Sequence, residues 1–418
     1  MGAREREMEK GLVSIDRWGD GSQAYFLTHL HTDHTSGLSS KWSRGTLFCS
    51  ATSAELLSTK FPDFDLSLIR VLEVGVTQLV LLRSPSSGSE VRLLVTPIDA
   101  HHCPGWAGAV MYLFRGEFGC VLHTGDFRWE IMNERAVMAK KTFMDALEGS
   151  KIDILYLDNT YCHPSFSFPT REVASQQVID IINSNPDHEV IIGIDTLGKE
   201  DLLLHISQAL GMKIWVWPER LKTMHLLKLN SNFTTNTSLT RVRAVPRYSL
   251  THETLSSLNT FHPTIGILPS GLPWRSKFLE KTPAAVAAAT NLNDKTPLTK
   301  LHQYAFSVQY SDHSCFSEIQ EFIRTFRPSK AAGLVSSSSY CINPRYYFSH
   351  LYENHHIRDV SCKDFRSKLD RKFEYEQRDN FVCKREKLSS LGGRVGAIRK
   401  GKLGAKIAEG EESEHLIL

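Results

Sequence analysis

The sequence predicts a layered α/β protein, and three features of its apolar pattern support this prediction. From residue 11 to 160, short apolar runs of strand length are interrupted by only two helical stretches, 51–59 and 133–147. After residue 165, helical and strand-like segments alternate, which is typical of a parallel sheet. Near residue 305 a strand pattern returns. A chain of this kind buries its apolar faces by stacking helices on sheets.

The individual elements follow in chain order. The strands predicted before residue 160 are LVSID (12–16), AYFLT (24–28), TLFCS (46–50), VRLLVTPIDA (91–100), AVMYLF (109–114), GCVLHTGDF (119–127) and ILYLDNT (154–160). The next elements we expect are a helix at 171–184, a strand at 188–195, a helix at 199–210 and a strand at 212–217. The last elements are a strand at 305–311, a helix at 314–326 and a strand at 331–339.

Three stretches lack this periodicity. Residues 230–240 are polar and predict a loop, and residues 281–300 have low complexity and predict a linker or surface excursion. Beyond Asp359 the apolar pattern fades, and residues 384–406 form a basic segment that we expect to be disordered. A basic segment of this kind attracts phosphates without regard to sequence, and it is equally typical of a nuclear import signal.

Length and composition exclude several classes of protein. With 418 residues the chain is long enough for two or three units, and 41% hydrophobic with 23% charged residues is ordinary for a globular protein. No apolar run reaches the ~18 residues of a membrane span, and the charged N-terminus does not resemble a secretory signal. Eight cysteines without a CxxC pair predict reduced thiols. We therefore expect an intracellular protein that does not enter a membrane.

One short segment concentrates titratable side chains. In YFLTHLHTDHTSGL (25–38), His29 and His31 alternate, so an extended backbone places both rings on one side, and Asp33 and His34 follow as the strand ends. Imidazole nitrogen and carboxylate oxygen suit zinc, with manganese or iron as alternatives. A loop that is rich in histidine by chance is the competing interpretation. Four such residues in the pattern HxHxDH favour a metal site.

Further candidate ligands follow other predicted strands. Strand ends on one sheet edge converge in space, so side chains placed there can complete a metal site. The same position at a strand end also suits a polar cap or turn. The candidates are His101 or His102, Asp126 and His313, with Asp16 as a residue that orients a ligand.

Five motifs in this order resemble a known family. HLHTDH (29–34), HHCPG (101–105), TGDFRW (124–129), LDNTYC (157–162) and YSDHS (310–314) are similar to the metallo-β-lactamase fold, and more narrowly to the β-CASP nucleases of DNA cross-link repair. The resemblance implies an αββα sandwich interrupted by a β-CASP domain that covers the cleft. The implied divisions are 11–165 and 301–355 for the metallo-β-lactamase domain, 166–300 for the β-CASP domain, and 356–418 for a C-terminal extension.

The resemblance also implies roles for individual residues. One zinc would be held by His29, His31 and His102, and a second by Asp33, His34 and His313, with Asp126 as the bridge. Asp33, Asp158 and His313 would be catalytic, Asp158 by orienting a ligand histidine or the attacking water. Val335 lies where DNA-directed members carry valine and RNA-processing members histidine. Two zinc ions would supply hydroxide near neutral pH and stabilise the charge that develops on the phosphodiester.

The chain departs from the family pattern in the second motif, HHCPG. The family usually has asparagine where this chain has His101, which leaves two adjacent histidines as candidate ligands, and His102 is favoured because it directly precedes Cys-Pro-Gly. The following loop, PGWAGAVMYLF (104–114), is longer than in the family. It lies where it would reshape the cleft beside the metals.

An end-acting nuclease also needs a group that binds the DNA end. DTLGKED (195–201) opens a predicted helix, and a helix N-terminus with a glycine is a suitable anion site. The resemblance implies a 5′-phosphate pocket formed by Gly198, Lys199 and Ser311. The competing interpretation is that Gly198 only turns the chain and Lys199 is solvated. Aromatic and cationic residues that could stack on bases are Trp215, Trp217, Trp274 and Arg275, with core packing favoured for the first two.

The function expected from these residues is a metal-dependent 5′→3′ DNA exonuclease that acts in interstrand cross-link or end repair. The resemblance implies that the substrate is DNA with a 5′-phosphate, either single- or double-stranded. It also implies a location in the nucleus and a monomer that contacts other repair proteins. The alternatives are an RNA-processing β-CASP nuclease, a small-molecule hydrolase such as a thioesterase, and a non-catalytic scaffold. A lid of ~130 residues argues against a small substrate. The complete ligand set argues against a scaffold.

Overall fold

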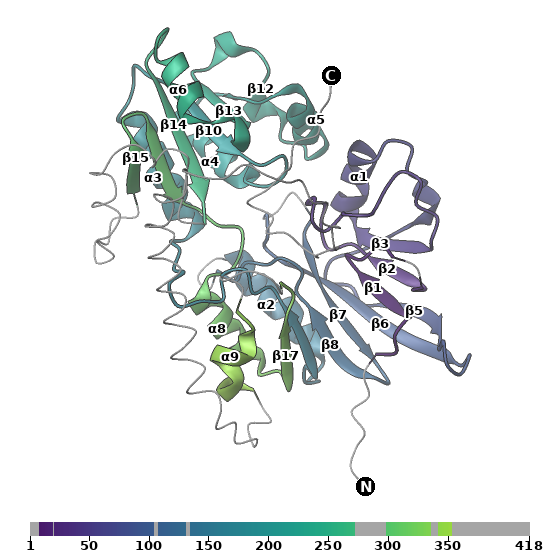
Figure 1. Cartoon of the computed structure of the whole chain (residues 1–418). Coiled ribbons are helices and arrows are strands. Elements are labelled where there is room, and N and C mark those ends of the chain that lie inside the picture. The colour runs from purple at the N-terminus through teal and green to yellow at the C-terminus, as the bar shows by residue number, and fades with distance from the viewer. Residues whose placement is uncertain are drawn as a thin grey trace, which may run out of the picture.

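A computed structural model describes residues 8–19, 21–103, 108–130, 134–271, 298–335 and 342–352. In this part of the chain the molecule forms two lobes, with a four-stranded and a six-stranded sheet in the first lobe and a seven-stranded sheet in the second (Figure 1). The first lobe combines the N-terminal elements with the last green elements in Figure 1, and the teal second lobe comes from the middle of the chain. No helix of the described residues is long and apolar enough to cross a membrane.

The four-stranded sheet is parallel and begins the first lobe. Its strands pair in sequence order, β1 (Val13–Ile15), β2 (Ala24–Phe26), β3 (Thr46–Ser50) and β4 (Ile69–Leu72). Helix α1 (Ala51–Lys60) follows β3 directly, because the Ser50 side chain accepts a hydrogen bond from the Ser53 amide and caps the helix. A short 3-10 turn, Leu66–Leu68, leads into β4.

The six-stranded sheet closes with a strand from the end of the described chain. Its order is β17 (Lys330–Gly333), β9 (Ile154–Leu157), β8 (Gly119–His123), β7 (Val110–Gly116), β6 (Glu90–Asp99) and β5 (Gln78–Arg83). β5 to β8 form an antiparallel meander, whereas β9 lies parallel to β8 and β17 parallel to β9. The return of the chain to this sheet brings residues after 310 back to the first lobe.

Side-chain alternation along the strands assigns the two faces of this sheet. Tyr112, Phe114 and Val121 pack with Phe26 between the two sheets. Their neighbours Leu113 and Leu122 point the other way, into a layer formed by α2 (Glu134–Leu147), α8 (Phe316–Phe326) and α9 (Pro344–Phe348). α1 covers the outer face of the four-stranded sheet. The predicted order helix, sheet, sheet, helix is confirmed.

The second lobe is a sheet covered on both faces. Its order is β12 (Phe233–Thr234), β11 (Ile214–Trp215), β13 (Val242–Pro246), β10 (Glu189–Ile194), β14 (Thr264–Ser270), β16 (Ala305–Gln309) and β15 (Leu298–His302). All pairs are parallel except β15 with β16. The covering helices are α3 (Arg171–Asn183), α4 (Glu200–Leu210), α5 (Pro218–Leu226) and α6 (His252–Leu258). The parallel sheet expected from the alternating pattern is confirmed.

One apolar cluster joins the lobes. It contains Leu56 and Leu57 of α1, Met224 of α5 and the buried faces of β10 and β14. α1 and α5 lie next to each other where the lobes meet (Figure 1). The lobes therefore share a core at this point, which restricts their relative movement.

The structure also contains elements that the sequence pattern did not predict. They are β4, β5, β12, β13, β14, β15, α5, α6 and α9. β12 and short 3-10 turns lie within residues 230–240, which were expected to be a loop. The strands β15 and β16 pair with β14, so this sheet extends to Gln309, past the domain boundary predicted at residue 300. The domain division itself stays a prediction.

Several expectations fall outside the described residues. They concern most of the stretch 281–300, the C-terminal extension 356–418 with its basic segment, and Trp274 and Arg275. The cysteines in the described part, Cys49, Cys103, Cys120, Cys162 and Cys315, are buried free thiols, in agreement with the prediction from composition.

The aromatic layer under α8 predicts a large effect of one truncation. The ring of Phe322 is fully buried, and its centroid lies 4.9 Å from that of Phe127, 5.0 Å from that of Trp129 and 4.8 Å from that of Phe326. We expect Phe322→Ala to lower the free energy of unfolding by about 3–5 kcal/mol, because it leaves a cavity that these rings cannot fill. Urea denaturation measures the change. Phe261→Ala, at a position 78% exposed, is the control and should shift the midpoint little.

Candidate metal centre

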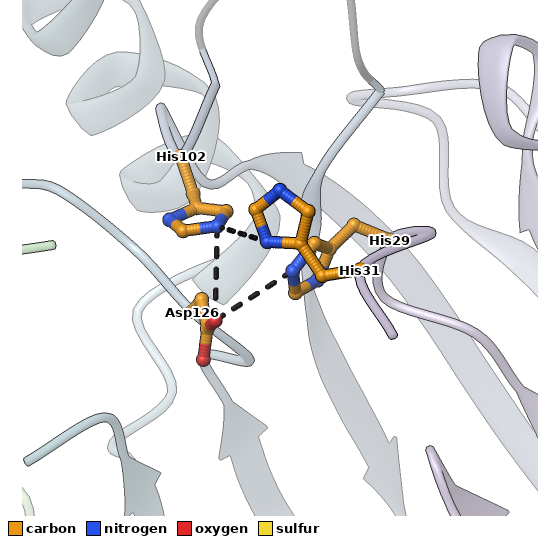
Figure 2. Close-up of side chains that lie close together, drawn as sticks. All are labelled: His29, His31, His102 and Asp126. Atoms are coloured by element: carbon orange, nitrogen blue, oxygen red, sulfur yellow. Dashed lines mark hydrogen bonds and ion pairs between the residues drawn. The ribbon is translucent and has the colours of Figure 1, made fainter. Parts of the chain in front are cut away.

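The candidate ligands come from the ends of strands in all three sheets. His29 and His31 follow β2, and His102 and Asp126 follow β6 and β8 of the six-stranded sheet. His313 follows β16 of the second lobe. Figure 2 shows the side chains of His29, His31, His102 and Asp126 turned toward one another from separate segments. The strand ends thus bring together residues that are up to 284 positions apart, from His29 to His313.

The first group contains three imidazoles and one carboxylate. His102 Nε2 lies 3.0 Å from His31 Nδ1, and 3.7 Å from Asp126 Oδ2. His29 Nε2 lies 3.6 Å from the same carboxylate oxygen. One ligand atom from each of the four residues lies within 4.8 Å of the others. Ligands of a single zinc, each ~2.0–2.2 Å from the ion, are separated by distances of this order.

Two further groups share the same carboxylate. Asp33, His34 and Asp126 form one, in which His34 Nε2 lies 3.4 Å from Asp33 Oδ2 and 3.2 Å from Asp126 Oδ2. Asp126, Asp158 and His313 form the other, with His313 Nε2 3.9 Å from Asp126 Oδ2. Asp126 belongs to all three groups, so its side chain is placed to contact more than one ion.

Unpaired polar atoms indicate that the cluster fits a cation. His29 Nε2, Asp33 Oδ1 and Asp126 Oδ2 are buried without a hydrogen-bond partner among the described residues. A buried polar atom without a partner is costly, and a buried charge costs more, unless it is paired or coordinates a metal. The donor set of nitrogen and carboxylate oxygen is the set that zinc and similar divalent ions bind.

Electrostatics keep most of these groups in the form that binds metals. Burial lowers the pKa of His29 and His102 well below the ordinary value, so both rings are neutral near pH 7. Burial raises the pKa of Asp33, but the hydrogen bond from His34 outweighs it and holds that pKa below its ordinary value. His34 differs, because Asp126 and Asp16 outweigh the effect of burial and raise its pKa well above the usual range.

Carboxylates behind the cluster orient two of the rings. Asp16 Oδ2 lies 2.7 Å from His34 Nδ1, and Asp16 also accepts hydrogen bonds from the amide and hydroxyl of Thr28. Asp158 Oδ2 lies 2.8 Å from His313 Nδ1, while its other oxygen accepts from Thr160. Each carboxylate holds one ring nitrogen and leaves the other facing Asp126, the arrangement by which outer groups orient metal-binding histidines.

Comparisons with known proteins found a matching family model and related sequences. A model of the family "DNA repair metallo-beta-lactamase" matches residues 227–339. The chain is 38% identical over 327 residues to the 5′ exonuclease Apollo of Gallus gallus, covering 77% of this chain and 62% of that protein. The chain is thus similar to proteins of DNA repair, and its residues 227–339 match the model of the DNA repair metallo-β-lactamase family.

Other relatives carry names from DNA repair. Identity is 36% over 331 residues to the 5′ exonuclease Apollo of Rattus norvegicus, covering 77% of this chain and 53% of the relative. It is 31% over 331 residues to the DNA cross-link repair 1A protein of Homo sapiens, covering 76% and 28%. The chain therefore spans at most 62% of the length of these three relatives.

The structure distinguishes the two adjacent histidines of the HHCPG motif. His102 faces the cluster, and its Nδ1 lies 2.9 Å from the Asp312 carbonyl oxygen. His101 has the positive φ of 54°, its Nε2 lies 3.7 Å from Asp99 Oδ2, and it belongs to none of the three groups. The positive φ of His101 turns the chain at this point, so the side chains of His101 and His102 point in different directions.

The residues expected to bind the DNA end lie beside the cluster, and two of them already have partners. A Cβ added at Gly198, which has φ of +99°, would lie 3.6 Å from His31 Nε2, so this loop closely approaches the metal-binding ring. Lys199 Nζ lies 2.8 Å from Asp195 Oδ2 and 3.7 Å from Asp312 Oδ2. The Ser311 hydroxyl donates to the His313 carbonyl and accepts from the His313 amide, so it shapes the turn that carries this ligand.

Val335, Trp215 and Trp217 also have structural contacts. Val335 exchanges backbone hydrogen bonds with the Asn159 side chain, which fixes it beside the LDNT motif. Trp217 packs against the apolar cluster between the lobes, and Trp215 donates its indole N–H to the Thr235 carbonyl. Sequence reasoning missed the carbonyls of Leu197 and Asp312, which contact His31 and His102, since a backbone acceptor has no signature in the residue pattern.

The unpaired atoms predict that zinc stabilises the protein. A ligand that binds only the folded state at 100 times its Kd adds about 2.7 kcal/mol of stability. We expect added zinc to raise the thermal midpoint of chelator-treated protein, and His29→Ala to remove most of that shift. Differential scanning calorimetry measures it. The control is His262→Ala, at an exposed position of the second lobe, which should keep the full shift.

Proposed function

We propose that this chain is a metal-dependent 5′→3′ DNA exonuclease that acts in the repair of interstrand cross-links and DNA ends. The observation that supports it most directly is the placement of Asp126 in three metal-binding groups, because a shared carboxylate suits the two-metal hydrolysis of phosphodiesters. The names of the relatives, a 5′ exonuclease and cross-link repair proteins, suggest the substrate class and direction.

We infer that the centre holds two zinc ions. His29, His31 and His102 would hold the first and Asp33, His34 and His313 the second, and Asp126, which belongs to all three groups, would contribute to both. Zinc supplies Lewis acidity, and lowers the pKa of a bound water to about 7. The catalytic residues proposed from the chain are Asp33, Asp158 and His313. Asp158 acts by holding His313 Nδ1, a contact of 2.8 Å, and Asp33 stays ionised because its pKa is held low.

The substrate proposed is single- or double-stranded DNA with a 5′-phosphate. Gly198, Lys199 and Ser311 form the proposed pocket. The close approach of the Gly198 loop to His31 supports it, because a phosphate beside Gly198 would place the next phosphodiester near the metals. A bound phosphate would share the Lys199 ammonium with Asp195, which lies 2.8 Å away. Ser311 contributes by positioning His313 through its two backbone hydrogen bonds.

The domain division belongs to the same proposal. Residues 11–165 and 301–355 form the metallo-β-lactamase domain, 166–300 form the β-CASP lid, and 356–418 form a C-terminal extension. Nuclear location follows from the repair role proposed, as do contacts with other repair proteins. We propose that the protein acts as a monomer.

An RNA-processing nuclease is the second candidate. Val335, fixed beside Asn159, favours DNA, because the RNA-processing branch is expected to carry histidine there. A small-molecule hydrolase is disfavoured by the size of the second lobe, which a small substrate does not need.

Activity on defined substrates tests the proposal. We expect the full chain with zinc to shorten 5′-phosphorylated DNA from its 5′ end, faster than RNA of the same sequence, and a chelator to stop it. His31→Ala should reduce the rate at least 100-fold, an order expected for loss of a metal-binding residue. Gel analysis of 3′-labelled strands measures direction and rate. Faster cleavage of RNA would replace this function by the second candidate.

The end-binding pocket is tested separately. We expect removal of the 5′-phosphate to lower kcat/KM about 10- to 100-fold, corresponding to about 1.4–2.8 kcal/mol of lost binding. Lys199→Ala should slow cleavage of the phosphorylated strand and leave cleavage of the 5′-hydroxyl strand nearly unchanged. Kinetics on paired substrates measure both effects. If the two substrates are cleaved equally by the unmodified protein, the pocket does not bind a phosphate.

A further inference from the structure

His31 makes a hydrogen bond that determines which of its nitrogens faces the metal. Its Nε2 lies 3.2 Å from the carbonyl oxygen of Leu197, in the loop between β10 and α4 of the second lobe. A carbonyl oxygen can only accept, so Nε2 carries the proton. The Cys103 sulfur, 3.6 Å from the same nitrogen, is the weaker partner. Nδ1 is therefore the nitrogen left to bind a metal, and it lies 3.0 Å from His102 Nε2.

This geometry sets His31 apart from the other histidines of the cluster. His29, His34, His102 and His313 present Nε2 to Asp126. The Nδ1 atoms of His34 and His313 are held by Asp16 and Asp158, both from the first lobe. The orientation of His31 depends instead on a backbone carbonyl in the second lobe.

A buried guanidinium holds the loop that carries this carbonyl. Arg220 of α5, whose side chain is fully buried, donates to the carbonyls of Thr196 and Gly198, on either side of Leu197. It also forms an ion pair of 2.8 Å with Glu200 Oε1. Glu200 in turn accepts from the Gly198 amide at 2.9 Å. The loop is thus fixed from both its carbonyl and its amide side, with the Leu197 carbonyl directed at His31.

We propose that Arg220 is a positioning residue for the metal centre. By holding residues 196–200 it fixes the Nε2–H tautomer and the ring orientation of His31, and with them the affinity for the metal at His29, His31 and His102. Arg220 contacts neither a ligand side chain nor the reacting atoms. The inference rests on the metal centre of the proposed function, and extends it by making the second lobe part of that centre.

The energetics favour a role of Arg220 in positioning the loop over a role in the overall stability of the fold. A buried ion pair is weak evidence for stability, because desolvation offsets the attraction between the charges, and apolar residues of similar volume often serve as well. Arg220 also satisfies two loop carbonyls that an apolar side chain would leave unsatisfied. Replacement of both charges should therefore keep the fold while releasing the loop, which separates positioning from stability.

The experiment compares two double variants of the full chain. Arg220→Met with Glu200→Met removes the clamp without leaving a buried charge. Arg243→Met with Glu189→Met is the matched control, because this pair, 2.9 Å apart, lies on neighbouring strands of the same sheet and outside the 196–200 loop. Zinc affinity is measured by competition with a chromophoric chelator. Folding is checked by thermal unfolding in excess chelator.

A spectroscopic measurement addresses the tautomer itself. In protein labelled with ¹⁵N-histidine, the nitrogen shifts of His31 report which ring nitrogen is protonated, with His31→Gln used for assignment. We expect Nε2–H in the unmodified protein and a mixture of tautomers in the Arg220 variant. We also expect zinc affinity to fall about 10- to 100-fold in that variant, as for other outer residues of metal sites, and to stay within twofold in the control.

The outcomes separate this inference from the proposed function. If the double variant Arg220→Met with Glu200→Met folds and its zinc affinity is unchanged, the positioning role of Arg220 is wrong. Protonation of Nδ1 in the unmodified protein would overturn it as well, even where the variants do not fold. If the unmodified protein binds no zinc, the metal centre itself fails, and the inference fails with it. If the unmodified protein binds zinc but has no nuclease activity, the proposed function is rejected. The positioning role of Arg220 can still be confirmed in that case, because it is measured by zinc affinity and by the tautomer of His31.

Discussion

The carboxylate of Asp126 is the constraint around which the other groups are arranged. Its Oδ2 lies between 3.2 and 3.9 Å from the Nε2 atoms of four histidines, and has no hydrogen-bond donor among the described residues. A charge buried in this way needs a compensating charge, and burial keeps His29 and His102 neutral. The cation His34 compensates in part, through its raised pKa. A divalent ion would complete the compensation, which is the physical reason why the cluster fits a metal.

The position of Asp126 relative to its neighbours depends on the packing of three sheets. The core between the first two sheets sets the distance from β2 to β8. The apolar cluster that α1 and α5 share connects the second lobe to the first. Buried ion pairs also connect the two lobes. Arg171, the first residue of α3, contacts Glu130 at 2.9 Å and Asp312 at 3.5 Å, and Asp312 supplies the carbonyl beside His102. The arrangement of the lobes and the geometry of the candidate ligands are therefore coupled through rigid packing.

The sequence predicted the parts of this structure that are specified by side chains with one strong preference. Long apolar runs such as 91–100 gave correct strands, because the strand pattern there is uninterrupted. β5 was missed although it is apolar, since it is an edge strand whose Leu79 and Leu81 are exposed and so lacks the expected alternation. β14 contains Gly266 and Pro269, which argue against a central strand in a sequence but are tolerated in the middle of this sheet.

In the site, too, the features that side chains specify could be predicted from the sequence, whereas the others could not. Histidine and aspartate at strand ends are visible in the sequence, and the structure brings His29, His31, His102 and Asp126 together. The acceptors that orient these rings are partly backbone carbonyls, from Leu197 and Asp312, and any residue could supply them. Arg220 could not be found either, because an arginine within PERLKTMHL is typical of an exposed helix face. Its burial results from the docking of α5 at the junction of the lobes, which no local pattern encodes.

Exposure of the ligand side chains indicates how a substrate reaches the centre. The side chains of His29 and His102 are 1% exposed, His313 6% and His34 14%, whereas Asp33 is 26% exposed. The cluster is therefore closed on the side of His29 and His102 and open on the side of Asp33. In the proposed function, a phosphodiester would approach over the turn that contains residues 31–34. The Leu197 carbonyl and Gly198 lie against His31, at one edge of that turn. A loop of the second lobe thus borders the accessible side of the centre, where it orients the His31 ring and, in the proposed function, would contact the end of a bound strand.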